Sequence, residues 1–121
     1  MMELRVISKD GIKCIRNLKI GELILCESNV FMPIRSILVI ASNGSCIRLS
    51  DNFKFNIHPR LKIKTSNGFK YPEIWDTIPI SKNFTPMVTS INDLVDIRIF
   101  YDILIDGNIL SPEGIVFKFG D

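Results

Sequence analysis

The chain has 121 residues, is 46% hydrophobic and carries a formal net charge of +2, which fits one folded domain and excludes an intrinsically disordered chain. It contains 21 isoleucines but only one alanine, Ala41, and no glutamine. Because isoleucine favours strands whereas alanine and glutamine favour helices, this composition excludes a helix bundle or a coiled coil. The near balance of 15 basic and 13 acidic residues provides no strong overall attraction to nucleic acid or to an anionic membrane.

No targeting signal is visible in the sequence. Residues 1–5 begin no long apolar stretch, and apolar runs such as 37–41 are too short to cross a bilayer. The cysteines, Cys14, Cys26 and Cys46, are odd in number and irregularly spaced, so we expect reduced, buried thiols in a cytoplasmic protein. The excess of isoleucine, asparagine and lysine is typical of an AT-rich genome, such as that of some phages, and indicates the host cytoplasm or a virion as the location.

Turn signals recur about every ten residues, a spacing typical of a β-sandwich or β-barrel. In the first half, Asp10-Gly11 and Asn43-Gly44 each predict a hairpin turn, because these residues tolerate positive φ. The elements expected there are strands at 5–8, 12–15, 22–26, 34–41 and 46–50, with one helical turn at 17–21.

The second half continues the alternation of apolar and polar residues that is typical of strands. The elements expected there are strands at 53–57, 60–64, 96–106 and 115–119, turns at 67–68, 106–107 and 112–114, a helical turn at 72–76 and an irregular connection at 78–87. The whole pattern predicts a single all-β domain over residues 1–121, with one or two short helical turns.

The alternation also predicts the core, which we expect to include Trp75 in part. The side chains expected to face inward are those of Val6, Ile12, Leu18, Leu23, Leu25, Ile37, Val39, Ile47, Leu49, Ile63, Ile99, Ile103 and Val116. The strand at 96–106 has apolar residues on both of its faces, so both faces are expected to be partly buried.

The side chains that could carry chemistry form no complete site in the sequence. The cysteines and the single histidine, His58, lack the close spacing of structural zinc sites, so no metal and no other cofactor is expected. A cysteine paired with His58 stays open as a nucleophile, although each cysteine lies in an apolar strand pattern where thiols are inert. The carboxylates Asp93, Asp96, Asp102 and Asp106 are interpreted as solubilising or turn-making groups.

Basic residues concentrate between positions 54 and 70. Lys54, Arg60, Lys62 and Lys64 alternate with apolar residues, so they would line one strand face that could follow a phosphate backbone. The same pattern is typical of a solvated strand face or of an edge protected from aggregation by lysines. We prefer this second interpretation because the net charge is low, and keep nucleic-acid binding as an alternative function.

Three segments, in the right order, resemble the characteristic segments of Hint domains, the module shared by inteins and the autoprocessing part of hedgehog proteins. Residues 6–11 and 15–25 resemble the opening strand, Asp-Gly turn and "LKxGDxVL" motif. Residues 55–59 and the Asn67-Gly68 turn resemble the "TxxHP…G" motif, with His58 in the histidine position. Residues 101–108 and 113–116 resemble the C-terminal "YDLxVxGN…xGIxVHN" motif. The resemblance implies a compact, pseudo-symmetric Hint-like β module.

The same comparison indicates which catalytic positions have changed. The Hint nucleophile would precede Met1, so we expect it to be missing from this chain. Phe55 stands where the family has a threonine that polarises the scissile bond, and a phenyl ring cannot donate a hydrogen bond. Lys118 and Phe119 stand in place of the terminal histidine and cyclising asparagine, which leaves His58 as the retained position.

The expected function is therefore that of a non-catalytic structural or protein-interaction module, such as a phage accessory protein or virion component. Its partner would be another protein or a second copy of the chain. Phe31, Met32, Phe84 and Met87 lie in two expected loops that could contact this partner, although loops folded onto the core would show the same residues. An autoprocessing remnant is kept as a further alternative, and no membrane is expected.

Overall fold

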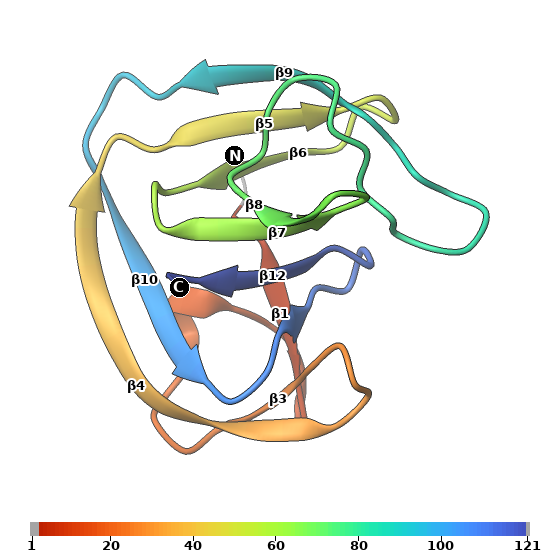
Figure 1. Ribbon diagram of the computed structural model, residues 1–121. Coiled ribbons are helices and arrows are strands. Elements are labelled where there is room, and N and C mark those ends of the chain that lie inside the picture. The colour runs from red at the N-terminus through yellow and green to blue at the C-terminus, as the bar shows by residue number, and fades with distance from the viewer. Residues whose placement is uncertain (1–2, 121) are drawn as a thin grey trace.

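The protein is described by a computed structural model, in which residues 3–120 are defined well enough for description (Figure 1). This part of the chain contains twelve strands and one short 3-10 helix. The elements are β1 (Arg5–Ser8), β2 (Gly11–Cys14), η1 (Ile15–Asn17), β3 (Leu23–Leu25), β4 (Phe31–Ser42), β5 (Ser45–Leu49), β6 (Lys54–Ile57), β7 (Leu61–Thr65), β8 (Gly68–Lys70), β9 (Val88–Asp93), β10 (Arg98–Ile105), β11 (Ile109–Leu110) and β12 (Val116–Phe119). The expected all-β fold class is confirmed.

The strands form three antiparallel sheets. Their orders are β10-β4-β3-β1-β2, β11-β12-β7-β8 and β6-β5-β9. The long strands β4 and β10 lie side by side and run along one side of the molecule, linking its upper and lower parts (Figure 1). Their pairing brings Ser42 opposite Arg98 and Ile34 opposite Ile105, so segments far apart in the sequence form one ribbon.

All three sheets contribute side chains to one core. Strand alternation places every second residue inward, as in β7, where Leu61 and Ile63 are buried and Lys62 is not. The expected core residues that are buried are Val6, Leu18, Ile47, Leu49, Ile63, Ile103 and Val116, and those that are half-buried are Leu25 and Ile37.

Five expected core residues are exposed, and those predictions are wrong: Ile12, Leu23, Val39, Ile99 and Trp75. Ile12 lies on β2, which is an edge strand. Val39 and Ile99 share the face of the β4–β10 ribbon that is open to solvent toward Ser42 and Arg98. Trp75 lies in a turn rather than in the expected helical turn at 72–76, because its backbone has a left-handed φ of 79°.

Three other local features differ from the predictions. The expected helical turn at 17–21 lies earlier, at η1, and β9 was not expected. Asn43-Gly44 does not close a hairpin, because β4 pairs with β10 and β3, whereas β5 pairs with β6 and β9. Gly44 instead forms the corner at which the chain leaves one sheet for another. Its φ is 70°, and a Cβ atom there would lie 2.5 Å from the carbonyl oxygen of Ile57.

Candidate functional site

His58 follows β6 and lies at the centre of the candidate site. The side chain is only 2% exposed. Its ring stacks on Phe119 of β12, with centroids 5.3 Å apart, and lies 5.4 Å from the ring of Phe100 on β10. Three segments that are distant in the sequence therefore enclose the one histidine of the chain.

The hydrogen bonds of His58 define its tautomer. The backbone N–H of Arg60 donates to Nδ1 over 3.1 Å, so a neutral ring must carry its proton on Nε2. Nε2 lies 2.5 Å from Oδ1 of Asp102, in a close contact that departs from straight hydrogen-bond geometry. Both ring nitrogens are thus already engaged by groups of the protein itself.

Asp102 is the second polar group of the site. Oδ2 of its carboxylate accepts a hydrogen bond from Nε of Arg60 over 2.7 Å, and the side chain is buried. Burial raises the pKa of Asp102, but the contact with His58 and the hydrogen bond and positive charge of Arg60 outweigh it, so the pKa lies below its ordinary value of 3.8. Asp102 is therefore held in its charged form.

The prediction that Asp102 is a solubilising residue is wrong. Asp102 shares a face of β10 with Phe100, and at this point of the strand that face packs into the interior, so both side chains are buried. The other carboxylates of the group stay at the surface. Asp96 precedes β10, Asp106 pairs with Arg35 over 2.9 Å, and Asp93 accepts a hydrogen bond from Ser45.

Of the three changed Hint positions, Phe119 contacts His58, Phe55 lies in the core, and Lys118 points elsewhere. Phe55 is fully buried, and Phe119 stacks on the histidine ring. Nζ of Lys118 lies over the ring of Phe69, 5.0 Å from its centroid, since strand alternation points it away from Phe119. The rings of Phe100 and Phe119 thus enclose His58, whose nitrogens contact Arg60 and Asp102.

The cysteines do not join this site. Of two hollows that His58 lines, one of about 650 Å³ and one of about 10 Å³, neither has a cysteine in its wall. Cys14 is exposed, Cys46 is half-buried and Cys26 is buried, so the expectation of three buried thiols holds only for Cys26, whose pKa is raised by burial. All three are free thiols. Within residues 3–120, no three His, Cys, Asp or Glu side chains are grouped to hold a metal ion.

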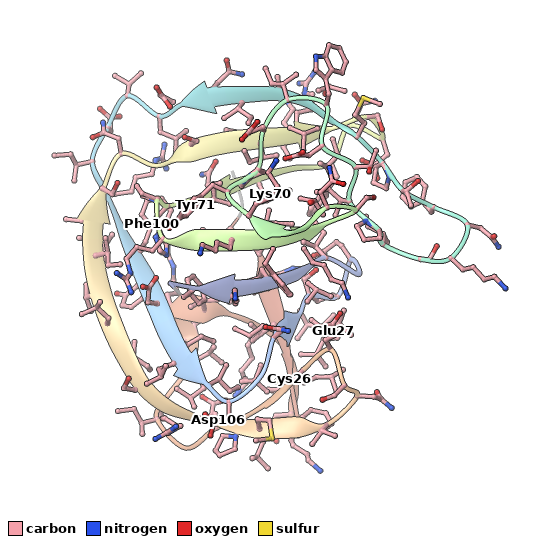
Figure 2. All side chains as sticks on the ribbon, in the orientation of Figure 1. Cys26, Glu27, Lys70, Tyr71, Phe100 and Asp106 are labelled. Atoms are coloured by element: carbon pink, nitrogen blue, oxygen red, sulfur yellow. The ribbon has the colours of Figure 1, made fainter. Side chains whose placement is uncertain are left out.

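The larger hollow lies at the corner between β4 and β5. Gly44, Tyr71 and Leu94 line it. The ring of Phe100 lies so close to Gly44 that an added Cβ atom would be 2.7 Å from it. Figure 2 shows the labelled Tyr71 and Phe100 side chains on this side of the molecule. His58 contributes little surface to the hollow because it is almost completely buried.

The basic residues do not share one strand face, so that prediction is wrong. Lys54 lies on β6, in a different sheet from β7, which carries Lys62 and Lys64. Arg60 pairs with Asp102, Lys64 pairs with Glu27, and Lys62 lies over the ring of Tyr71. The hydrogen bond from Lys64 lowers the pKa of Glu27. Most of this positive charge is thus compensated within the protein.

The expected contact residues lie in two places. Phe31 and Met32 begin β4 rather than forming a loop, and both are half-buried because they pair with β3. Phe84 is 43% exposed in the segment that projects between β8 and β9, and Met87 at the base of that segment is half-buried (Figure 1).

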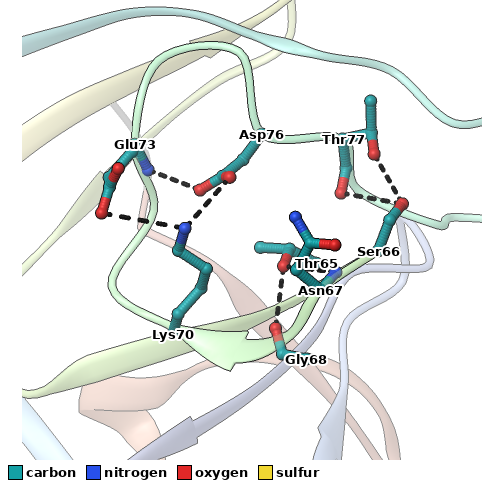
Figure 3. Close-up of polar contacts among 8 residues, drawn as sticks. All are labelled: Thr65, Ser66, Asn67, Gly68, Lys70, Glu73, Asp76 and Thr77. Carbon is teal, nitrogen blue, oxygen red and sulfur yellow. Dashed lines mark hydrogen bonds and ion pairs between the residues drawn. The ribbon is translucent and has the colours of Figure 1, made fainter.

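Trp75, which the sequence placed partly in the core, has the most exposed aromatic side chain of residues 3–120, at 71% exposure. The sequence therefore did not identify it as a possible contact residue. Its backbone N–H donates to the carbonyl oxygen of Val88 over 2.9 Å. The adjoining Asp76 accepts hydrogen bonds from the Glu73 backbone and from Lys70 (Figure 3). These bonds hold the turn against the protein and leave the indole in solvent.

Comparison with known proteins supports the fold. Solved structures of inteins and of an intein-like domain match nearly the whole chain. The chain therefore has a Hint-like all-β fold. The crystal structure of the gp41-1 intein has a TM-score of 0.81 at 16% identity, over 99% of this chain and 95% of that chain. The Msm DnaB1 intein splicing domain bound with zinc has a TM-score of 0.77 at 11% identity, over 98% of each chain. The bacterial intein-like domain from Clostridium thermocellum has a TM-score of 0.71 at 12% identity, over 99% of each chain.

The sequence comparisons add no family assignment. No protein-family model matches the chain, and no curated protein sequence matches it either. In the described part of the chain, no helix is long and apolar enough to span a membrane.

Proposed function

We propose that this chain uses a Hint-like fold without its chemistry and acts as a protein-interaction module. The observation that carries the proposal is the enclosure of His58. A general base must reach the proton it abstracts. This ring is 2% exposed, its Nδ1 accepts a backbone hydrogen bond, and its Nε2 contacts Asp102.

The neighbouring side chains support the same proposal. Phe55 and Phe119 have no hydroxyl, thiol or amide with which to polarise or attack a peptide bond. Self-processing needs a nucleophile and its activator together, so the replaced positions argue against it. One structural relative is named as a splicing domain, which makes self-processing the alternative that an experiment must exclude.

The test uses the full chain with an unrelated peptide segment fused to each end. Intact-mass spectrometry over several days, with and without added thiol or hydroxylamine, should detect only the unprocessed mass. The matched control is the same fusion carrying His58→Ala. If a flanking segment is lost from the unsubstituted fusion and kept in the control, autoprocessing replaces the proposed function.

The proposed contact surface is the segment between β8 and β9, with Trp75 and Phe84 as exposed aromatic groups. Tryptophan is enriched among the residues that dominate binding energy at protein interfaces. Phe31, Met32 and Met87 remain proposed contacts of lesser exposure. The composition supports a phage accessory protein or a virion component as the setting of this module.

A further inference from the structure

The outer face of the three-stranded sheet β6-β5-β9 carries a grid of polar side chains. Residues directly opposite each other in an antiparallel sheet share a face. One row across the strands is Lys54, Arg48 and Ser90, and the next row is Asn56, Cys46 and Asn92, of which Asn56 is buried. The apolar residues of the same strands, such as Ile47 and Phe55, face the core. This sheet lies in the upper part of Figure 1.

Two cations of this grid are uncompensated. Arg48 and Lys54 are directly opposite one another, an arrangement in which like charges destabilise a sheet. In the described part of the chain, neither side chain has an ion pair or a hydrogen bond. Other cations do have carboxylate partners, as Arg5 does in Glu113 and Lys13 in Glu22. Among residues 3–120, the two cations therefore have no ion-pair partner.

The two cations line a hollow of about 430 Å³. Its wall also includes Ser90 and Asn92, whose hydroxyl and amide groups are neutral donors. The one carboxylate in the wall belongs to Asp93. That carboxylate accepts a hydrogen bond from Ser45 over 3.2 Å, so it already has a partner within the protein. The hollow thus combines two positive charges and neutral donors with one carboxylate that is hydrogen-bonded to Ser45.

We propose that this hollow binds an oxyanion of the phosphate class, either inorganic phosphate or the phosphate group of a larger molecule. A guanidinium group can donate two parallel hydrogen bonds to a phosphate, and a lysine ammonium adds a point charge. Arg48 and Lys54 are the charged contacts and Ser90 the neutral one. The site is separate from the His58 site, so its existence does not depend on the proposed interaction function.

The experiment is an NMR titration of the full chain with inorganic phosphate at constant ionic strength, with chloride as the reference anion. Backbone amide signals from β5, β6 and β9 should shift and saturate. Arg48→Gln and Lys54→Gln should each weaken binding about tenfold, because each removes a charge-assisted hydrogen bond. The control is Arg98→Gln, which removes an unpaired arginine of β10 that does not line this hollow. It should leave the affinity unchanged.

Several outcomes would overturn the proposal: shifts that never saturate, shifts centred on other strands, or an equal loss of affinity in all three variants. Both key variants relieve like-charge repulsion, so they should keep or raise the thermal midpoint in chloride. Should either one fail to fold, the location and saturation of the shifts in the unsubstituted chain decide the question. A parallel titration with O-phosphoserine distinguishes the sources, since tighter binding than that of inorganic phosphate indicates a phosphate ester.

Discussion

At the scale of single residues, the contact between His58, Asp102 and Arg60 has more than one role. It neutralises a buried carboxylate and occupies both nitrogens of the histidine ring. Removing one partner from a buried charged cluster costs more free energy than the contact itself contributes, because the remaining charge loses its compensation. This cluster connects β10 to the turn between β6 and β7.

The first prediction concerns Asp102→Asn. The pKa of Asp102 is lowered in the folded protein, so its charge stabilises the fold above the unfolded value near 3.8, and this contribution is lost as pH falls through the folded value. We expect the substitution to lower the free energy of unfolding by about 1–3 kcal/mol at neutral pH. The difference from the unsubstituted protein should shrink below about pH 4, as measured by urea unfolding across pH.

Asp106→Asn is the control for that prediction. Asp106 lies close to Asp102 in sequence, but its ion pair with Arg35 is exposed to solvent. Exposed pairs contribute about 0–1 kcal/mol, so this variant should stay close to the unsubstituted protein at every pH. Equal effects of the two substitutions would contradict the special role assigned to Asp102.

At the scale of elements, the corner between β4 and β5 decides how the sheets are joined. Asn43-Gly44 has the composition of a hairpin turn, and the sequence predicts one. In the structure the chain passes there from one sheet to another, and an added Cβ atom at Gly44 would overlap the carbonyl oxygen of Ile57 and the ring of Phe100. The asparagine side chain secures the corner by donating to the carbonyl oxygens of Leu94 and Val95.

The second prediction follows from this corner. Gly44→Ala should destabilise the protein by about 2–4 kcal/mol, because it combines a left-handed backbone with steric overlap against Ile57 and Phe100. Gly21→Ala is the matched control, since φ there is 92° but nothing lies within 4 Å of an added Cβ atom. The control should cost about 1–2 kcal/mol, from the backbone alone. Thermal or urea unfolding measures both, and equal losses would contradict the packing argument.

At the scale of the whole molecule, exposed apolar side chains are numerous for a small domain. Those that are at least half exposed include Trp75, Val95, Ile97 and Val39. Among them, Trp75 supports the proposed interaction function, because tryptophan is enriched among the residues that dominate binding energy at interfaces.

The third prediction is therefore that the isolated chain self-associates as its concentration rises, as measured by light scattering coupled to size exclusion. Trp75→Ser should reduce this association, because it removes the most exposed aromatic group. Lys82→Ser, in the same segment, should leave it unchanged. A mass of one chain at all concentrations, combined with no bound partner, would contradict the proposed interaction surface.

The candidate site was only partly predictable. His58, Phe55 and Phe119 were found through the resemblance of short motifs to Hint domains, and the structure brings His58 and Phe119 into contact. Asp102 was present in one of those motifs but was interpreted as a surface residue. Its contact with Arg60 joins residues that are 42 positions apart in the sequence, and a local sequence pattern does not predict contacts between such distant residues.

The sequence by itself determined the all-β class and the positions of most strands, because β-branched residues, period-two alternation and turn residues act locally. The tertiary structure decided which isoleucines are buried, that β4 pairs with β10, and that Asn43-Gly44 is a corner. It also decided that Arg48 and Lys54 meet across two strands. These features depend on strand register and on the packing of sheets, and both are set by contacts between distant segments.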